Sequence, residues 1–558
     1  FGSYDFVVVG GGSAGAVVAS RLSEKQEWTV LLLEAGKDGN NFTNIPSMSV
    51  YAMSSDYNWG YNSAPQNTCC LASGGVCPFP RGKGLGGSSI LNALVYVRGN
   101  RLDYDEWEKL GNPGWGSKDV LPYFIKSENS NINGDPGYHG FGGYLNVEYH
   151  IPLSERVKVF LEANKQQGRS VLDYNGKEQI GASRNQFNEI HGRRLSSSNA
   201  FLDPVRNRTN LHILTESYVT KVLISNTTKK AYAVLFSHKN LEYSVKVNKE
   251  VILSAGIVGS AQILLQSGVG PENELQQLGI PVIKNLAVGE NLHDHLTFYY
   301  NYFLTYQYEP SFGLRDAIKQ FLNGTGPLTV STNTQGLSFY RLGLTNYGVP
   351  DIEIVIVPSV QSGGFDTMKR GVTHGHADED RWGKSISGNH VFQIVVVLLH
   401  PKTRGKIYLK SNNPYDYPII DSKCLADPHD EDIEGVYRGV QTVLKLLKTN
   451  AFKQLKPVLV PYPDCLHKIF LTKEYWKCLI RQTAMNAYHG GGTCQMGPDP
   501  SKGAVVNNRL QVHGIPNVRV ADASIAPITV SAHMNAPAMM IGEKAADFVK
   551  EDYGALNK

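Results

Sequence analysis

The chain lacks three features that would narrow its class immediately: a long apolar run, a strong net charge and a paired-cysteine zinc motif. No stretch approaches the ~18 consecutive apolar residues of a membrane-spanning helix. The nearest, Val391 to Leu399, contains Gln393 and predicts a buried strand. The net charge is only +4, and no basic run or stripe indicates a nucleic-acid partner. We therefore expect neither nucleic acid nor a membrane among the partners of this chain.

Seven cysteines are present, none in the C-x-x-C pair that is usual in zinc sites, and we expect no metal site. Cys465 and Cys478 lie close enough in the sequence to close a disulfide across a loop and a helix. Cys69, Cys70 and Cys77 lie in a Pro- and Gly-rich segment, which predicts a stapled surface loop. A zinc site is the alternative interpretation of that cluster.

Length, composition and sequons predict a secreted protein of more than one domain. The 558 residues exceed the size of one ordinary domain, and 41% hydrophobic with 19% charged residues is typical of a compact globular chain. The sequence begins at Phe1 without an initiator Met, which leaves an earlier signal peptide open. Cysteine usage favours an oxidising compartment. Four N-glycosylation sequons support that expectation, at Asn41, Asn207, Asn226 and Asn323.

The start of the chain matches a dinucleotide-binding turn. An apolar strand over residues 4–9 leads into Gly10-Gly11-Gly12-Ser13-Ala14-Gly15, a G-x-G-x-x-G pattern that opens a helix of small residues. Gly10 permits the tight turn, Gly12 lets a pyrophosphate approach the helix N-terminus, and Gly15 lets the helix pack closely. A second strand ends at Glu34, which can accept hydrogen bonds from a ribose. A glycine turn without a ligand is the alternative, and the strand–helix–acid context argues against it.

A second glycine-rich loop, Arg81 to Ser89, leads into a mostly apolar run from Ile90 to Val97 that carries Asn92. Such a loop can lay backbone N–H groups against a phosphate or the edge of a flavin ring. A flexible linker is the alternative, but we do not expect a linker to lead directly into a patterned apolar segment. We interpret this loop as a second cofactor contact.

The middle of the chain differs from its ends. Strand patterns and a glycine turn followed by a helix (residues 260–267) continue the α/β character up to about residue 295. From about 296 to 480, strand patterns mix with one long helical pattern, which predicts an antiparallel sheet with helices on it. The last 75 or so residues return to α/β character. The expected strands are residues 211–214, 219–222, 243–247, 250–253, 352–357, 392–399 and 406–409, and the expected helix lies near 432–449.

Two histidines near the C-terminus are candidates for proton transfer. His489 precedes Gly490-Gly491-Gly492, and His533 lies in Ser531-Ala532-His533-Met534-Asn535. Histidine moves protons near neutral pH, and adjacent glycines let a cofactor or backbone come close. A hydrogen-bonded core histidine is the alternative for either residue. His293 and His295 are interpreted as structural, because two His and one Asp in a row cannot all face one point in regular structure.

These motifs together resemble the glucose-methanol-choline (GMC) family of flavin oxidoreductases, arthropod type, over essentially the whole length. The resemblance implies an α/β FAD-binding Rossmann-like domain plus an α+β substrate domain with an antiparallel sheet. It assigns residues 1–155, 200–295 and 485–558 to the FAD-binding domain, and residues 156–199 and 296–484 to the substrate-binding domain. The matching motifs are the glycine turn with Glu34-Ala35-Gly36, Gly82 to Asn92, Tyr104 to Trp107, Gly256 to Gly270, Val288 to Leu292, His489 to Cys494, and Asp522 to Pro537.

The resemblance also implies residue roles. His489 and His533 resemble the catalytic pair of the family, and Cys494 is expected behind His489, buried and unpaired. Members with covalent flavin carry a His where this chain has Leu91, so FAD is expected to be non-covalent. The expected FAD contacts are Gly10, Gly12, Ser13, Ala14, Gly15, Glu34, Ala35, Arg81, Gly86, Gly87, Ser88, Asn92, Ala93, Val95, Val219 (through its backbone, at the adenine), Ala255, Asp522, Ala523, His533, Met534 and Asn535.

The expected reaction is oxidation of a small, aromatic alcohol or α-hydroxynitrile such as mandelonitrile, with hydride passing to flavin N5 and O2 reduced to hydrogen peroxide. His489 is expected to act as base and His533 to hold the same oxygen. The alternatives are a glucose-type dehydrogenase with a quinone acceptor, an FAD-containing hydroxynitrile lyase, and a non-catalytic binding protein. The aromatic run Phe298 to Phe303 is expected in the sheet core, with a pocket wall as the alternative. The oligomeric state stays open between monomer and homodimer.

Overall fold

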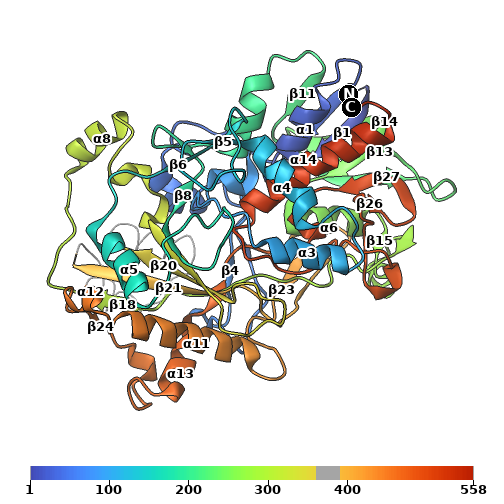
Figure 1. Cartoon of the computed structure of the whole chain (residues 1–558). Helices are drawn as coiled ribbons and strands as arrows, with labels where there is room; N and C mark the ends of the chain where they lie inside the picture. Colours follow the sequence, from blue (N-terminus) through green and yellow to red (C-terminus); the bar gives the residue numbers. More distant parts are fainter. Residues whose placement is uncertain (1, 360–389, 557–558) are drawn as a thin grey trace.

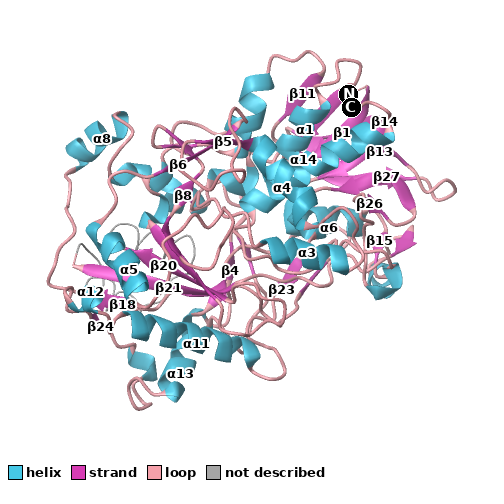
Figure 2. Cartoon of the chain, in the orientation of Figure 1, coloured by secondary structure: helices cyan, strands magenta, loops and turns pink. Residues whose placement is uncertain are grey.

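The computed structural model describes residues 2–359 and 390–556 and is built around two sheets (Figures 1 and 2). One sheet carries both chain termini, and the other is assembled from the middle of the chain (Figure 1). The two sheets therefore correspond to the two kinds of sequence pattern. This arrangement confirms the predicted combination of a Rossmann-like part and an antiparallel part.

The first sheet has the order β11-β2-β1-β14-β13-β12, with β27 and β26 added beside β14. Its centre is parallel, whereas β12, β13 and β14 form an antiparallel meander. Phe6 to Val9 of β1 are all buried, as expected for a strand covered on both faces. The strands are β1 (Ser3–Val9), β2 (Val30–Leu33), β11 (Leu211–Leu214), β12 (Ser217–Ile224), β13 (Ala231–His238), β14 (Leu241–Leu253), β26 (Gln511–Val512) and β27 (Ile515–Val520).

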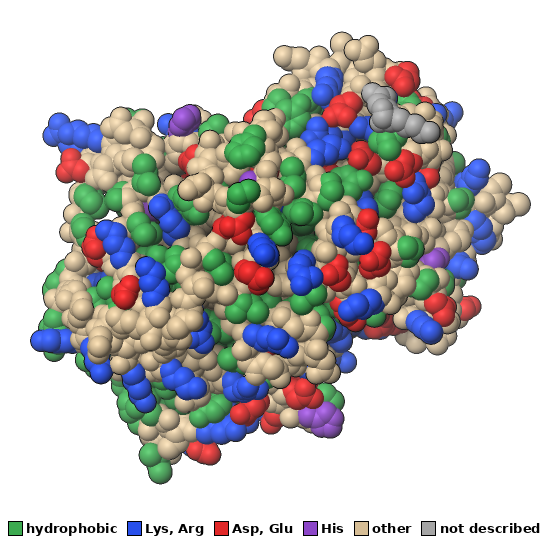
Figure 3. All heavy atoms as spheres, in the orientation of Figure 1, with side chains coloured by type: hydrophobic (Ala, Val, Ile, Leu, Met, Phe, Trp, Pro, Cys, Tyr) green, Lys and Arg blue, Asp and Glu red, His purple; other side chains and the backbone are tan. Residues whose placement is uncertain are grey.

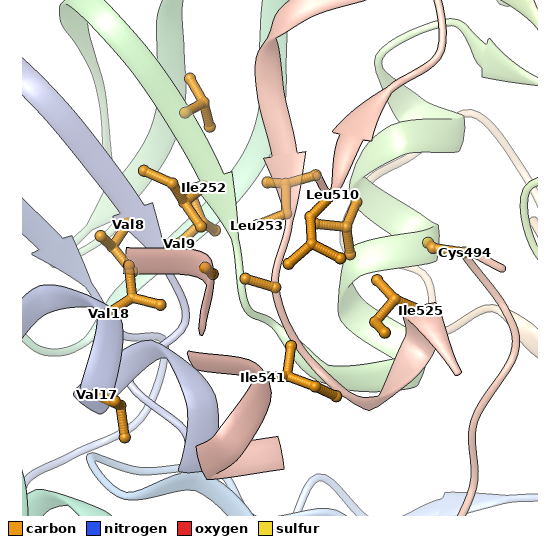
Figure 4. Packing of buried hydrophobic residues seen from close by; sticks show 14 of the residues in the cluster. Val8, Val9, Val17, Val18, Ile252, Leu253, Cys494, Leu510, Ile525 and Ile541 are labelled. Atoms are coloured by element: carbon orange, nitrogen blue, oxygen red, sulfur yellow. The ribbon is translucent and has the colours of Figure 1, made fainter. Parts of the chain in front are cut away.

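Helices α1 (Ser13–Leu22) and α14 (Asn535–Asp552) pack side by side beside β1 (Figure 1). A Cβ added to Gly542 would lie 2.6 Å from the Ala14 carbonyl oxygen, so glycine sets how closely the helices approach. Arg21 closes the contact with two 2.8 Å hydrogen bonds to the buried Glu543 carboxylate. The aliphatic core around Val8, Ile252 and Ile541 appears in Figure 4. This packing fixes where the N-termini of both helices point.

The second sheet has the order β24-β18-β21-β20-β19-β7, and β17 pairs with both β21 and β25. Helices α5 (Glu155–Gln166), α11 (Glu431–Leu446) and α13 (Lys473–Thr483) pack with one face of it in a single apolar cluster. The other face carries a separate cluster that includes Val95, from the apolar run that follows the loop Arg81–Ser89. The strands are β7 (Ala182–Arg184), β17 (Leu296–Phe298), β18 (Tyr302–Leu304), β19 (Gly336–Tyr340), β20 (Ile352–Val357), β21 (Val391–Leu398), β24 (Val458–Leu459) and β25 (Met485–Asn486).

The remaining elements lie outside the two large sheets. The remaining helices are α2 (Ser49–Met53), α3 (Arg101–Lys109), α4 (Ser117–Ser127), α6 (Gly256–Gln266), α7 (Glu272–Gln277), α8 (Leu314–Leu322) and α12 (Asn450–Lys453). Remaining strands are β3 (Tyr61–Asn62), β4 (Pro78–Phe79), β5 (Glu128–Ser130), β6 (Leu145–Tyr149), β8 (Gln186–Phe187), β9 (Glu189–Ile190), β10 (Arg193–Arg194), β15 (Val269–Gly270), β16 (Lys284–Asn285), β22 (Lys406–Tyr408) and β23 (Ile419–Asp421).

Most expected elements are present, and two differ from expectation. The strands expected at 243–247 and 250–253 form one continuous strand, β14, because β1 and β13 pair with it on both sides.

Strand membership also bears on the proposed domain division. β7 joins the second sheet, as a segment of residues 156–199 should, but β25 pairs with β17 in that same sheet. We therefore propose that the last FAD-binding segment begins at 487 and not at 485.

Three disulfides form: Cys69–Cys424, Cys70–Cys77 and Cys465–Cys478. The expected Cys465–Cys478 bond is confirmed, and Cys494 is free and buried in the core of the first sheet (Figure 4). The prediction of a stapled surface loop is wrong in its location, because Cys69, Cys70 and Cys77 are all buried. Cys69 joins a partner that is far away in the sequence, which proximity in the sequence could not reveal.

Charged side chains of both signs are interspersed over the face drawn in Figure 3. Within the described ranges, no helix combines the length and the apolar character needed to cross a bilayer. All four sequon asparagines, Asn41, Asn207, Asn226 and Asn323, are exposed.

Candidate active site

A cavity of about 700 Å³ lies where three parts of the molecule meet: the first sheet, the loop Arg81–Ser89, and the face of the second sheet opposite to α5, α11 and α13, called the free face below. Three helix N-termini reach it: those of α1 at Gly12, α6 at Gly256 and α14 at Asn535. None of these helices has an acidic residue in its first turn. Because helix N-termini offer free N–H groups and a positive dipole end, the cavity suits a large anionic ligand.

Almost every predicted site residue lines this one cavity. The exceptions are Gly15 and Gly86. The residues brought together are Gly10, Gly12, Ser13, Ala14, Glu34, Ala35, Arg81, Gly87, Ser88, Asn92, Ala93, Val95, Val219, Ala255, His489, Asp522, Ala523, His533, Met534 and Asn535.

Gly15 and Gly86 are not among the residues that line the cavity, so their contacts with the cofactor stay a prediction, and both support the backbone around the cavity. A Cβ added to Gly15 would lie 1.9 Å from the Gly10 carbonyl oxygen, so this glycine lets α1 pack on the turn. Gly86 donates its N–H to Gly11 O at 2.7 Å and thereby ties the two glycine loops together. Both glycines therefore position the backbone that forms the cavity wall.

The two glycine loops touch where an extended ligand would pass. A Cβ added to Gly87 would lie 2.6 Å from the Gly12 Cα, and one added to Gly10 would lie 2.5 Å from the Ser254 carbonyl oxygen. Any side chain at either position would therefore displace backbone. These contacts form a cradle that only glycine permits, and its exposed backbone faces the cavity.

Two buried acids border the cradle. Glu34 accepts hydrogen bonds from Gly11 N and Gly36 N, both at 2.8 Å, and burial raises its pKa to about 7. Asp522 accepts from Gly256 N, Ser260 Oγ and Ser524 N, and thereby caps the start of α6. Both carboxyl groups keep lone pairs that can accept hydrogen bonds from ligand hydroxyls. The donors and acceptors therefore fit a dinucleotide with its phosphates at the helix N-termini.

His489 and His533 lie next to one another in the wall of the cavity, with ring centroids 4.7 Å apart and planes 34° apart. The backbone before His489 is strained, because Tyr488 has φ +65°. Arg81 Nη2 donates to Tyr488 O at 2.5 Å, and the His489 N–H donates to Asp294 Oδ1 at 2.8 Å. These two contacts hold the turn that presents His489.

A second histidine sets the proton position on His489. His295 Nε2 lies 2.9 Å from Val530 O, which can only accept, so Nε2 carries the proton of neutral His295. His295 Nδ1 is then an acceptor, and it lies 3.1 Å from His489 Nδ1. His489 must therefore carry its proton on Nδ1. This leaves His489 Nε2 as an unprotonated acceptor, without a hydrogen-bond partner in the described parts of the chain.

Both of these rings are neutral near pH 7. Burial, with the charge of His533 as a further cause, lowers the pKa of His489 well below its usual value. Burial likewise lowers the pKa of His295 to about 3. A neutral imidazole with a free Nε2 lone pair can accept a proton from a hydroxyl group. The cavity therefore contains a ready general base.

His533 has a different neighbour. Its Nε2 lies 3.0 and 3.2 Å from the two carboxylate oxygens of Glu353, which is fully buried on β20. Nε2–H therefore donates to the carboxylate, which fixes the orientation of the His533 ring. The pair thus combines a neutral ring that has a free Nε2 lone pair with a ring that is oriented by a carboxylate, an arrangement suited to moving a proton at a shared substrate oxygen.

Asn92 is held by a residue that the sequence analysis did not single out. Its Oδ1 accepts from Arg194 Nη1 at 2.8 Å and from Leu94 N at 3.1 Å. Arg194 is buried and also donates to Ser89 O at 3.0 Å. With Oδ1 occupied, Asn92 can offer Nδ2 to the cavity as a donor. The orientation of this amide is therefore fixed in advance.

Sequence reasoning missed Glu353, His295 and Arg194 as contributors to the site. Glu353 carries a signal, because it is a charged residue within the otherwise apolar Ile352–Val357 strand. His295 was interpreted as structural, and it does bond to the backbone, but it also contacts His489. The aromatic run lies in the core, as expected, with Phe298, Tyr300, Tyr302 and Phe303 in one cluster. Tyr299, Tyr300 and Tyr302 also line the cavity, so the alternative of a pocket wall holds for these three.

Comparison with known proteins gives one consistent result. Two family models described as GMC oxidoreductase match residues 4–297 and 401–542. The chain is 40% identical to glucose dehydrogenase [FAD, quinone] of Drosophila melanogaster, over 99% of this chain and 87% of the relative. It is 35% identical to alcohol dehydrogenase [acceptor] of Pseudomonas putida, over 99% of this chain and 97% of the relative.

Solved structures agree. A formate oxidase superposes with a TM-score of 0.87 at 26% identity, covering 100% of both chains. Pyridoxine 4-oxidase from Mesorbium loti superposes with a TM-score of 0.82 at 26% identity, again covering 100% of both chains.

Proposed function

The chain belongs to the GMC oxidoreductase family, and from this premise we propose that it is an FAD-dependent alcohol dehydrogenase that passes electrons to a quinone or similar acceptor. FAD as the cofactor and oxidation of CH–OH groups follow from the family. The quinone-type acceptor is the alternative of the sequence analysis. It is supported by the names of two relatives that match over 99% of this chain, one of which gives a quinone and the other an unspecified acceptor. The observation that carries the proposal is the neutral His489, whose Nε2 is free in the cavity beside His533.

The residues of the cavity fit FAD. The cradle of Gly10, Gly12 and Gly87 and the helix N-termini suit the pyrophosphate, and Glu34 suits the adenosine ribose. Asn92 and the start of α14 at Asn535 would meet the flavin end, where donors and a positive dipole end suit a ring that gains negative charge. Leu91 offers no nucleophile, so the flavin is held without a covalent bond.

The chain's own residues then perform the proton chemistry. His489 Nε2 accepts the proton of the substrate hydroxyl, since its lone pair is held toward the cavity by the hydrogen bond to His295. His533, supported by Glu353, holds the same oxygen and stabilises the alkoxide as it forms. FAD, when bound, would supply the acceptor for the hydride that leaves the carbinol carbon. Proton removal and hydride loss are coupled because an alcohol releases hydride readily only as its O–H proton leaves.

An oxidase is the second candidate: oxidation of a small aromatic alcohol or of mandelonitrile, with O2 reduced to hydrogen peroxide. It is supported by the valine-rich wall of the cavity, which suits an apolar substrate. The two candidates share the proton-transfer chemistry and differ in the acceptor.

The test is anaerobic mixing of the purified holoenzyme with a panel of alcohols, followed by absorbance of the flavin band. We expect bleaching with at least one alcohol, and His489→Ala should slow it about 10²-fold or more. FAD content and thermal midpoint control for folding. Reoxidation by a quinone faster than by air would support the dehydrogenase, and the reverse order would favour the oxidase. Bleaching at the wild-type rate in His489→Ala would remove this residue from the role of base.

We further propose a secreted glycoprotein. Three disulfides are typical of oxidising compartments, and the four sequons are exposed. Treatment with a peptide N-glycosidase should lower the apparent mass of the protein purified from its source.

A further inference from the structure

We propose that the substrate carries a hydrocarbon body, an aryl or cycloalkyl group next to the carbinol carbon, and that Val355, Val357, Val395 and Val397 select it. This inference rests on the proposed function and names its substrate class. It departs from the sugar that the 40% identical relative, a glucose dehydrogenase, is named for. It is drawn from the pairing register of the neighbouring strands β20 and β21.

On the free face of the second sheet, a row of residue pairs begins at the histidine pair and runs along β20 and β21. Glu353, which holds His533, lies directly opposite Val397 in the antiparallel pair β20–β21. Residues two apart on a strand share a face, so the next pairs on this face are Val355–Val395 and Val357–Gln393. All four valines line the cavity. A row of branched aliphatic side chains therefore begins beside the histidine pair, where the substrate oxygen would bind.

On β20 and β21 the polar groups of this face are Glu353 and Gln393, at the two ends of the row, and Thr297 of β17 lies opposite Val397, beside the Glu353 end. Glu353 is occupied by His533, and Gln393 Nε2 donates to the Tyr299 carbonyl oxygen. The distance from Glu353 to Val357 along the strand is about 13 Å, enough for one or two carbocyclic rings. Val95, from the apolar run after the loop Arg81–Ser89, and Val330 belong to the same apolar cluster and also line the cavity.

A hexose does not match this wall. It carries a hydroxyl on nearly every carbon, and each hydroxyl that leaves water without a partner weakens binding. The valines offer no donor or acceptor over the span where those hydroxyls would lie. A phenyl or cyclohexyl group loses nothing there and gains apolar contact.

Substitution on the two faces of one strand isolates the effect. Val395→Thr keeps the shape and adds a hydroxyl to the cavity wall, whereas Val396 points into the core behind the sheet. Val396→Thr is therefore the matched control for lost stability. We expect Val395→Thr to raise the Kd of an apolar alcohol about 10-fold, and Val396→Thr to lower the thermal midpoint without changing that Kd.

The experiment measures anaerobic flavin bleaching by benzyl alcohol, cyclohexylmethanol and glucose, and binding of the unreactive benzamide from the flavin spectrum. We expect the apolar alcohols to exceed glucose at least ~100-fold in reduction rate divided by Kd. Glucose equal to or better than both would overturn the substrate class and leave the proposed function intact. If no alcohol bleaches the flavin but benzamide binds more weakly in Val395→Thr alone, the apolar site stands and the proposed function fails. Equal binding of benzamide by both variants overturns the inference.

Discussion

The hydrogen bond between His295 and His489 predicts that a residue without substrate contact controls the base. The wrong tautomer of His489, with its proton on Nε2, would set two unprotonated Nδ1 atoms against each other 3.1 Å apart. It would thus lose one hydrogen bond and leave two buried acceptors unpaired. An unsatisfied buried polar atom costs about 1–3 kcal/mol, so the structure favours the base-competent tautomer by at least that amount.

His295→Phe should remove this preference, which alone halves the base-competent tautomer, and it also removes the acceptor that stabilises the imidazolium formed when His489 takes the proton. A hydrogen bond to a charged group contributes about 1.5–3 kcal/mol. Flavin reduction should therefore slow about 10- to 150-fold, since each 1.36 kcal/mol corresponds to about tenfold in rate. Stopped-flow bleaching without oxygen measures the reduction step directly. His293→Phe is the matched control, because His293 is also buried and bonds to a backbone oxygen, Ala526 O, at 3.0 Å. We expect the control to lose stability while its rate of flavin reduction stays close to wild type.

The acidity of the substrate separates a positioning role from a general loss of structure. A more acidic alcohol, such as a ring-nitrated benzyl alcohol, needs less help from the base, so the defect of His295→Phe should shrink along a series of increasing acidity. A merely structural defect has no reason to follow that series. Equal slowing by both histidine variants, independent of alcohol acidity, would refute the reasoning.

Three further predictions follow from other contacts of the described chain. Glu353→Gln keeps an acceptor for His533 but removes the charge, so flavin reduction should slow roughly 10- to 100-fold with little change in substrate Kd, measured by stopped flow. The carboxylates of Asp173 and Glu128 outweigh burial and raise the pKa of His139 to about 9 from 6.5. Stability from this group is therefore complete below about pH 6.5 and lost as pH rises through 9, and His139→Gln should flatten the thermal midpoint over that window. Because Leu91 cannot attach flavin, acid precipitation should leave all FAD in the supernatant, and colour in the pellet would contradict this.

Local motifs were sufficient to predict the cofactor half of the site. Gly10, Gly12 and Glu34 lie within one βαβ unit, so their relative positions follow from strand and helix geometry alone. Gly87 depends on a second loop, yet its glycine pattern is itself readable. The division of the chain into a Rossmann-like part and an antiparallel part was predictable for the same reason, since each rests on a repeated local pattern.

The catalytic half depends on contacts between distant segments. Glu353 and His533 are 180 residues apart, and His295 and His489 are 194 apart. No local pattern encodes such a meeting, so a buried Glu in an apolar strand could be noticed but not paired. Cys69–Cys424 is a third case, with a sequence separation of 355.

This division between local and distant contacts explains how one fold can serve several substrates. The cradle and the helix N-termini of the first sheet depend on backbone geometry, so they tolerate few changes without losing the cofactor. The wall of β20 and β21 is made of side chains on a finished sheet, where Val355 or Val395 can be exchanged without moving the strands. A full-length relative can therefore share the histidine pair and the cofactor site while binding a different alcohol. In this chain the valines beside Glu353, and not the overall likeness, determine which alcohol is oxidised.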